Sequence, residues 1–341
     1  MNVGLLNRNY HCMRYMSDLC YWLLTPSFCR CCCATSTSQE VLPSESVACS
    51  GDDDTGRCST WCTKSADRIR IEEDSAELSC LLLHCPSHTM PPSGSAILIG
   101  AGPTSGGGIA RYLASPKGGN LAVAIMARNK DNLQKLASDI RSKEPGSIVH
   151  PIPSDTSSAS LQSAFEQFSS HADFKDLKLK LAIYHVKHSS KEPFLDTTPE
   201  SFADSLNTYS VGAFTFAQMA TKLSYAQHGG QTSLAETGGQ KKATIILTGT
   251  LGALRTNVGF AAYGSTRAAA RSIAQALAKE HSAYGIHCVH AIANGSIRDE
   301  DTQETRTGVR MSAKSVADTY LWLANQSPSL WVHEVRTGAG E

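Results

Sequence analysis

The sequence predicts an α/β domain built on one doubly wound parallel sheet with helices on both faces, preceded by a cysteine-rich segment with little structure. After Pro92, short aliphatic runs alternate with amphipathic segments, which is the pattern of strands and crossover helices. The strand-like runs are apolar along their length, and this indicates a parallel sheet covered on both faces. We therefore divide the chain into a segment 1–92 and a domain 93–341.

The elements of this domain follow in a regular order. Strands are expected at 96–100, 121–127, 147–152, 180–186, 243–248, 286–292 and 330–335. Helices are expected at 107–115, 130–142, 158–168, 198–206, 211–223, 261–284 and 312–325. The stretch 227–242 is expected to be a surface insertion, and the charged stretch 298–310 a mobile lid. Ligands of such sheets bind outside the carboxyl ends of the strands, so the turns there should line the site.

Composition excludes several classes of partner. The 31 basic and 31 acidic residues balance, so no overall field attracts nucleic acid or an anionic membrane. No apolar run reaches the ~18 residues of a membrane span. Eleven of the twelve cysteines precede residue 90, which leaves a domain typical of a reduced compartment. We expect the cytoplasm, and a few early arginines make the mitochondrion the alternative.

The first 92 residues are expected to be mostly disordered. The crowded Cys29, Cys31, Cys32 and Cys33 lack the paired, well-separated spacing of zinc knuckles, so no metal site is predicted. Met90 leads directly into the first strand and is therefore a candidate translation start, which the mass of the native N-terminus would test.

A glycine-rich turn between the first strand and the first helix is the strongest functional signal. It contains Gly100, Gly102, Thr104, Ser105 and Gly106. Glycines there let backbone N–H groups and a helix N-terminus approach a phosphate. The order of strand, turn and helix favours a dinucleotide, although a tight turn without a ligand is the alternative.

Arg128 follows the second strand, where an acidic residue would hold the ribose hydroxyls of NAD. A guanidinium at this place pairs with a 2′-phosphate, so NADP is the expected cofactor and NAD the alternative. The alternative is that Arg128 is an ordinary solvated charge on the surface and binds no cofactor.

From residue 93 to 337 the chain resembles the short-chain dehydrogenase/reductase family, whose fold is Rossmann-like. The turn 99–106 is similar to the first glycine motif of that family in its Gly-Ala-Gly-Pro form. The resemblance implies that Asp155 contacts the adenine and that Asn294 and Gly295 form the turn near the nicotinamide. Residues 331–335 resemble the closing strand of some members.

The resemblance also implies a catalytic pair, because the family carries a Tyr-x-x-x-Lys motif. Here the motif is Tyr263 with Arg267, and Thr250, thirteen residues earlier, stands where the family has a serine. Four residues apart on a helix places two side chains on one face, and a nearby cation favours the phenolate. Arginine supplies the charge but cannot release a proton near neutral pH. A core tyrosine, a surface arginine and a turn threonine are the structural alternatives.

Four places depart from the family pattern. Thr104 replaces the middle glycine, and Arg267 replaces the lysine. Residues 184–187 replace Asn-Asn-Ala-Gly, and their bulk is expected either to narrow the cofactor cleft or to supply Lys187 as a substitute contact. Tyr209 corresponds to the asparagine that holds a relay water.

These features lead to two hypotheses. The first is an oxidoreductase that uses NADP to act on a small carbonyl or alcohol, with Tyr263 exchanging the proton, Thr250 orienting the oxygen and Arg267 favouring the phenolate. The second is a catalytically silent relative that binds NADP(H) as a sensor or scaffold. The long helices beginning near Val211 and Ala261 resemble those through which the family forms homodimers and homotetramers.

Overall fold

The computed structural model describes residues 90–188 and 190–339. The expectations for the cysteine-rich leader, including its disorder and its thiols, concern residues outside the described part of the chain. Everything below refers to the described residues.

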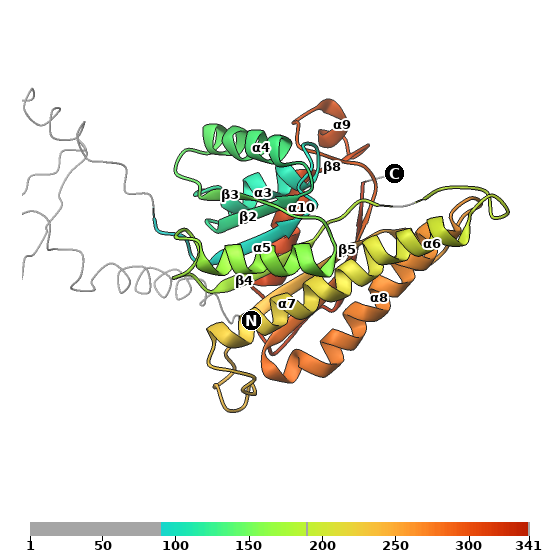
Figure 1. The fold of residues 1–341 in the computed structure, drawn as a ribbon. Helices are drawn as coiled ribbons and strands as arrows, with labels where there is room; N and C mark the ends of the chain where they lie inside the picture. Colours follow the sequence, from blue (N-terminus) through green and yellow to red (C-terminus); the bar gives the residue numbers. More distant parts are fainter. Residues whose placement is uncertain (1–89, 189, 340–341) are drawn as a thin grey trace, which may run out of the picture. The chain divides into compact units, whose positions relative to one another are not determined.

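Seven parallel strands form one sheet in the order β3-β2-β1-β4-β5-β6-β9 (Figure 1). Their core positions are almost entirely aliphatic on both faces, which is why the sheet is parallel and covered. The predicted doubly wound sheet is confirmed. The strands are β1 (Ser95–Ile99), β2 (Ala122–Ala127), β3 (Val149–Pro153), β4 (Leu179–Tyr184), β5 (Ala243–Gly249), β6 (Ile286–Asn294) and β9 (Glu334–Gly338).

Helices cover both faces of this sheet. On one face α3, α4 and α10 share a core with the strands, and on the other α5, α7 and α8 do so (Figure 1). Ser157, Thr198 and Ser312 cap their helices through side-chain oxygens. The helices are α3 (Gly106–Ala114), α4 (Lys130–Lys143), α5 (Ser158–Ser170), α6 (Pro199–Ser205), α7 (Gly212–Gln227), α8 (Ala261–His281), α9 (Gln303–Arg306) and α10 (Ala313–Ala324).

Short irregular helices connect several of these elements. A π-helical segment, η2 (Leu206–Val211), joins α6 to α7, so the two predicted helices form one continuous stretch. The 3₁₀ turn η3 (Leu251–Ala253) follows β5, and η4 (Ser282–Tyr284) ends α8. π-helical segments are rare and frequently lie at functional sites, which directs attention to Tyr209 within η2.

The predicted position of the last strand is wrong, because the strand begins four residues later than expected. The strand was expected at 330–335, but β9 begins at Glu334, opposite His290. The apolar residues before it pack elsewhere: the Trp331 ring stacks on His287 at 5.0 Å, and the N–H of Val332 donates to Gln326. Apolarity therefore marked a packing segment, whereas register with β6 set the strand.

The stretch 298–310, which is expected to be a mobile lid, contains regular secondary structure, and its mobility stays a prediction. This stretch begins with β7 (Ile297–Arg298), which pairs with β8 (Met311–Ser312), and it contains α9 between them. Thr302 and Thr305 form a reciprocal capping box at the start of α9. The charges that suggested a solvated lid are paired within the segment, as in Arg310 with Glu304 at 2.6 Å.

The order of the strands positions the site. β1 lies beside β4, and the connection that leaves β1 runs toward β2 whereas the one that leaves β4 runs toward β5, in the opposite direction along the sheet. In open parallel sheets this reversal leaves a crevice outside the carboxyl ends, where ligands bind. The glycine turn follows β1 directly at this place.

Candidate functional site

The glycine turn after β1 has a conformation that only glycine allows. Gly100 has a φ of +95°, and a Cβ there would lie 2.2 Å from the carbonyl oxygen of His185, which follows β4. A Cβ on Gly106 would lie 2.4 Å from the oxygen of Gly100. Gly102 differs, because a Cβ there would meet nothing within 4 Å. The turn is thus tightly packed on the protein side and open at Gly102.

The open side of the turn carries hydrogen-bond donors without partners. In the part of the chain that the structure describes, the N–H groups of Thr104, Ser105 and Gly106 have no backbone acceptor. These groups sit at the N-terminus of α3, where the helix dipole favours negative charge. Such an end is suited to a phosphate.

Ser105 precedes α3, but its hydroxyl makes no cap hydrogen bond with that helix. Its Oγ instead lies 3.2 Å from Nε2 of His185, whose Nδ1 lies 3.2 Å from Oγ1 of Thr248. Thr248 Oγ1 continues to the hydroxyl of Tyr320 at 2.8 Å. A chain of polar side chains therefore connects the glycine turn to the ends of β4 and β5 and to α10.

Burial lowers the pKa of His185 to about 4, so its imidazole is neutral at physiological pH. The sequence did not identify this histidine as a site residue. The only signal was its place directly after a strand, in the turn that departs from the family pattern.

Tyr263 and Thr250 meet as the sequence predicts. Thr250 follows β5 and caps η3, and Tyr263 lies in the first turn of α8. The Thr250 Oγ1 and the Tyr263 hydroxyl are 2.9 Å apart, so both can address one oxygen atom of a bound molecule. The Phe260 ring contacts the Tyr263 ring edge-on at 5.2 Å between centroids.

Arg267 is not the surface arginine that a structural interpretation allowed, because it is only 2% exposed. Its guanidinium carbon lies 3.8 Å from the centroid of the Tyr263 ring and 4.0 Å from that of Tyr209. Nη1 donates to Thr266 Oγ1 at 2.9 Å. No carboxylate among the described residues pairs with this cation. The charge is therefore held between two aromatic faces and acts directly on Tyr263.

Tyr209 and Tyr184 have structural roles that the sequence did not reveal. The Tyr209 hydroxyl donates to the carbonyl of Thr248 at 2.7 Å, and burial raises the pKa of Tyr209 to about 12. Tyr184 is 1% exposed and donates to the carbonyl of Thr208. Because Tyr184 points into the core, it does not narrow the cofactor cleft as expected; His185 is the residue of that turn that approaches the glycines. Lys187 is exposed.

A second cation lies near Tyr263. The ammonium of Lys191, in the loop after β4, lies 4.7 Å from the centroid of the Phe260 ring and 5.2 Å from that of Tyr263. The Lys191 side chain is exposed, unlike Arg267. No spacing in the sequence links it to the tyrosine.

Arg128 and Asp155 lie at the ends of β2 and β3, which are neighbours in the sheet. Both are exposed. Hydrogen bonds from the Ser157 hydroxyl and N–H lower the pKa of Asp155, and the charge of Arg128 adds to this effect. The two predicted cofactor residues are thus brought close to one another.

Asn294 and Gly295 form the turn after β6, again at the carboxyl end of the sheet. Gly295 has a φ of +144°, and a Cβ there would lie 3.2 Å from Sδ of Met311. The positive φ favours glycine here and the space beside Met311 is tight, and the role of this turn near the nicotinamide stays a prediction.

Beyond this turn, Asp299 packs against α3. A Cβ on Gly108 would lie 2.7 Å from Oδ1 of Asp299, so this helix glycine makes room for the carboxylate. Arg111 donates to Asp299 at 2.7 Å and to Glu144 at 3.0 Å. Hydrogen bonding and charge from Asp299 raise the pKa of Arg111 against the opposing effect of burial, which is the largest single influence. The acidic side chain beside the phosphate-binding end of α3 is therefore neutralised by Arg111.

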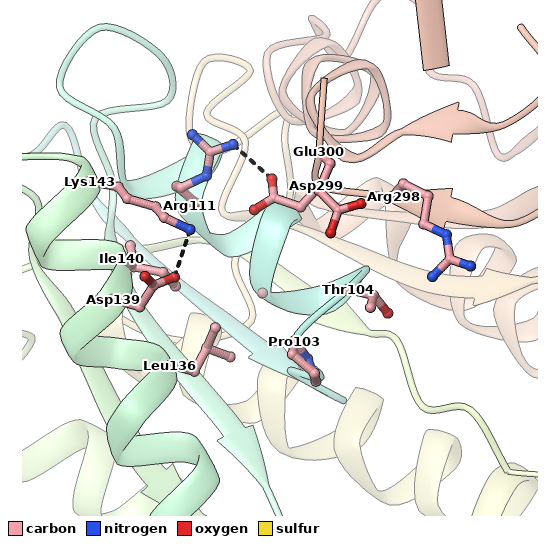
Figure 2. Close-up of a pocket in the computed structure, with 11 residues that line it drawn as sticks. Pro103, Thr104, Arg111, Leu136, Asp139, Ile140, Lys143, Arg298, Asp299 and Glu300 are labelled. Carbon is pink, nitrogen blue, oxygen red and sulfur yellow. Dashed lines mark hydrogen bonds and ion pairs between the residues drawn. The ribbon is translucent and has the colours of Figure 1, made fainter. Parts of the chain in front are cut away.

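A pocket of ≈ 120 Å³ lies on the outer side of the glycine turn, between α3, α4 and the segment after β6. Figure 2 shows Arg111 and Asp299 pointing toward one another across it, while the Arg298 side chain extends away from that pair. The pocket includes Thr104 but not Tyr263, Thr250 or Arg267. The pocket borders the glycine turn and is separate from Tyr263, Thr250 and Arg267, which we call the tyrosine cluster.

The residues present fit a dinucleotide. The open space at Gly102 and the unpaired N–H groups of Thr104–Gly106 form a cradle for a diphosphate. Arg128, Asp155 and the turn 294–295 lie along the same edge of the sheet as this cradle.

Comparison with known proteins identifies the family. The family model described as short chain dehydrogenase matches residues 95–309, and the chain belongs to this family. The general class of the family is NAD(P)-dependent oxidoreductase. A comparison with curated proteins finds no match.

Solved structures share the fold at low sequence identity. A short-chain dehydrogenase from Rhodopseudomonas palustris is 24% identical, with a TM-score of 0.57 over 72% of this chain and 99% of that one. An alcohol dehydrogenase from Thermococcus sibiricus, complexed with 5-hydroxy-NADP, is 16% identical, with a TM-score of 0.58 over 72% and 96%. A gluconate 5-dehydrogenase from Burkholderia cenocepacia, in complex with NADP and tartrate, is 16% identical, with a TM-score of 0.57 over 73% and 95%.

No helix in the described ranges is long and apolar enough to cross a membrane.

The packing of the glycine turn predicts opposite outcomes for two alanine substitutions. Gly100→Ala should lower the free energy of unfolding by about 2–4 kcal/mol, because the Cβ meets a backbone carbonyl at positive φ. Gly102→Ala, the matched control, should change it by less than about 1 kcal/mol, since its Cβ enters open space. Urea unfolding followed by circular dichroism measures both, and equal losses would contradict the described packing.

The neutral His185 predicts a pH dependence of stability. The pKa of His185 is about 4 in the folded chain and about 6.5 in an unfolded one, so only the unfolded chain takes up the proton between these values. Stability should therefore fall as the pH is lowered from about 6.5 toward 4. Urea unfolding at pH 7 and pH 5 should show a loss about 2 kcal/mol smaller in His185→Asn than in the wild type. Parallel losses in the two proteins would refute the assignment.

Proposed function

We propose that this chain is an oxidoreductase that prefers NADP and transfers a hydride between the nicotinamide and a small carbonyl or alcohol, with Tyr263 as proton donor and acceptor. The observation that carries the proposal is the pairing of the Tyr263 and Thr250 hydroxyls at 2.9 Å, with the buried Arg267 cation on the tyrosine ring. Two hydroxyls and one cation around a single point suit a carbonyl oxygen that gains negative charge.

The cofactor would be held along the carboxyl edge of the sheet. The N–H groups of Thr104, Ser105 and Gly106 would bind the diphosphate, with Gly100 and Gly102 allowing its approach. Arg128 would bind a 2′-phosphate, Asp155 the adenine, and Asn294 with Gly295 the nicotinamide end. When bound, the nicotinamide supplies or accepts the hydride.

Side chains of this protein would bind the substrate oxygen and transfer a proton to it. Thr250 and Tyr263 donate hydrogen bonds to the substrate carbonyl oxygen. As the carbonyl carbon accepts the hydride, its oxygen becomes an alkoxide, and Tyr263 transfers its phenolic proton to it. The resulting phenolate is stabilised by the charge of Arg267, which cannot itself give up a proton. In the oxidative direction the same steps run in reverse.

The two parts of the site are joined through Thr248. Its hydroxyl contacts His185, which reaches Ser105 of the glycine turn, and its carbonyl accepts from Tyr209, which stacks on Arg267. This connection supports a single site that combines nucleotide binding with the tyrosine cluster.

A second candidate is a nucleotide-binding sensor or scaffold without hydride transfer. The placement of Tyr209 favours it, because its hydroxyl is committed to the Thr248 carbonyl and cannot hold a relay water as an asparagine would. Tight NADPH binding in calorimetry with no turnover across a panel of carbonyl substrates would select this candidate.

We also propose a homodimer or homotetramer formed through α7 and α8. Val211 and Phe214, at the start of this helical stretch, are 49% and 48% exposed and offer apolar surface for such contact.

Removal of the phenol tests the catalytic assignment. Tyr263→Phe should lower NADPH-dependent turnover of a carbonyl panel about 100-fold or more, while NADPH affinity changes less than about threefold. The loss follows from removal of the transferable proton. Tyr284→Phe, at the opposite end of α8, serves as the control and should keep wild-type turnover. Equal rates in Tyr263→Phe and the wild type would rule out Tyr263 as the proton donor.

Removal of the guanidinium after β2 tests the cofactor preference. Arg128→Ala should weaken NADPH binding about tenfold or more, because it deletes a charge-assisted hydrogen bond to the 2′-phosphate, and should leave NADH binding unchanged. Lys130→Ala, an exposed cation two residues away, is the matched control. Isothermal calorimetry measures both nucleotides, and an unchanged ratio in Arg128→Ala would disprove the role of this residue.

A further inference from the structure

Two histidines and an aspartate cluster far along the sheet from the tyrosine site. His150 is the second residue of the edge strand β3, and His171 and Asp173 lie in the turn that follows α5. This turn leads toward the amino end of β4, whereas the cofactor cradle lies beyond the carboxyl ends. The cluster therefore lies near the amino ends of the strands, and the candidate cofactor site lies beyond their carboxyl ends.

The three side chains present their ligand atoms to one another. The Nδ1 atoms of His150 and His171 lie 3.9 Å and 3.6 Å from Oδ2 of Asp173. One donor atom from each of the three residues fits within 4.8 Å of the others. The two imidazole rings lie 3.7 Å apart between centroids, tilted by 41°.

The core holds this arrangement in place. Phe174, directly after Asp173, is fully buried and stacks on Phe168 with centroids 4.6 Å apart. The N–H of Phe174 donates to the carbonyl of His171, which closes the turn. His150 is fixed independently by the pairing of β3 with β2. The donors are thus preorganised on two anchored segments rather than on a free loop.

The hydrogen bonds of the two histidine rings show which of their nitrogen atoms are engaged. Nδ1 of His171 accepts the N–H of Asp173 at 3.1 Å, so this nitrogen carries a lone pair rather than a proton, and a metal ion bound there would replace that hydrogen bond. The His150 ring has no hydrogen-bond partner among residues 90–188 and 190–339.

We propose that His150, His171 and Asp173 form a binding site for one divalent transition-metal ion of the zinc class. Two imidazoles and a carboxylate are ligands that zinc prefers, at about 2.0–2.2 Å from the metal. Tetrahedral donors at such lengths lie about 3.3 Å apart, so the Nδ1–Oδ2 separations need to close by about 0.6 Å for His150 and about 0.3 Å for His171, and the two histidine nitrogens, within 4.8 Å of one another, close with them. Water completes the coordination.

Little positive charge opposes a cation at this cluster, and the cluster is accessible from solvent. Arg141, whose guanidinium donates to the Val149 carbonyl, is a nearby cation, and the carboxylate of Asp173 opposes its charge. The three side chains are about one-third to two-fifths exposed, which gives an ion a direct path from solvent. A bound ion would connect the edge strand β3 to the turn between α5 and β4.

The experiment is a zinc titration of the full-length chain by isothermal calorimetry, after its accessible thiols have been blocked with iodoacetamide. Blocking is needed because eleven cysteines precede residue 90, and free thiolates are zinc ligands that would obscure the titration. We expect one zinc ion per chain in the wild type. His150→Asn and His171→Asn should each weaken binding at least tenfold, and zinc should raise the melting temperature of the wild type but not of these variants.

Two further variants keep the test decisive. Asp173→Asn alters an exposed side chain without touching the core and should also weaken zinc binding at least tenfold. Asp176→Ala removes an exposed carboxylate three residues further on and should bind zinc as the wild type does. The proposal is overturned if the blocked wild type binds no zinc, or if Asp173→Asn and His171→Asn bind it with unchanged affinity.

Discussion

The close approach of the turn after β1 to the turn after β4 is the constraint on which the whole site depends. Parallel neighbours bring their carboxyl ends to one edge, and Gly100 lets the two backbones touch, since a Cβ there would lie 2.2 Å from the His185 carbonyl. Two consequences follow from this contact. The N–H groups at the start of α3 have no backbone acceptor among the described residues, and the His185 ring fits between Ser105 and Thr248. A side chain at position 100 would separate the phosphate cradle from the rest of the site.

The buried and partly buried arginines differ in whether a carboxylate pairs with them, and Arg267 beside Tyr263 has no such partner among the described residues. Arg111 is neutralised by Asp299 and Glu144, and Arg271 by Glu334. Arg267 is buried deeply, yet it is held by two aromatic faces and a hydroxyl. Aromatic contacts and one hydrogen bond offset part of the cost of burial without cancelling the charge. The positive charge therefore stays beside the Tyr263 ring, where the proposed function makes use of it.

The two edges of the sheet carry different chemistry. At the carboxyl ends of the strands, backbone N–H groups and a cation suit anions, whereas near the amino ends of β3 and β4 two imidazoles and a carboxylate lie together. The first set arises because helix N-termini meet strand ends there, and the second because the edge strand β3 has no further strand to cover His150. An ion at the second place would act on the rigidity of the edge strand, away from the proposed cofactor site.

The sequence alone determined the order of the elements, the parallel sheet and its glycine turn, because aliphatic runs and glycines act through local conformation and burial. It also determined that Tyr263 and Arg267 share a helix face, since four residues make about one turn. Only the tertiary structure decided which distant residues meet: the chain from Ser105 to Tyr320, the ring of Tyr209 over Arg267, and the cluster of His150 with His171. It likewise set the start of β9, because pairing with β6 rather than apolarity selected Glu334. Such contacts depend on register and packing between segments far apart in the chain, which no local pattern encodes.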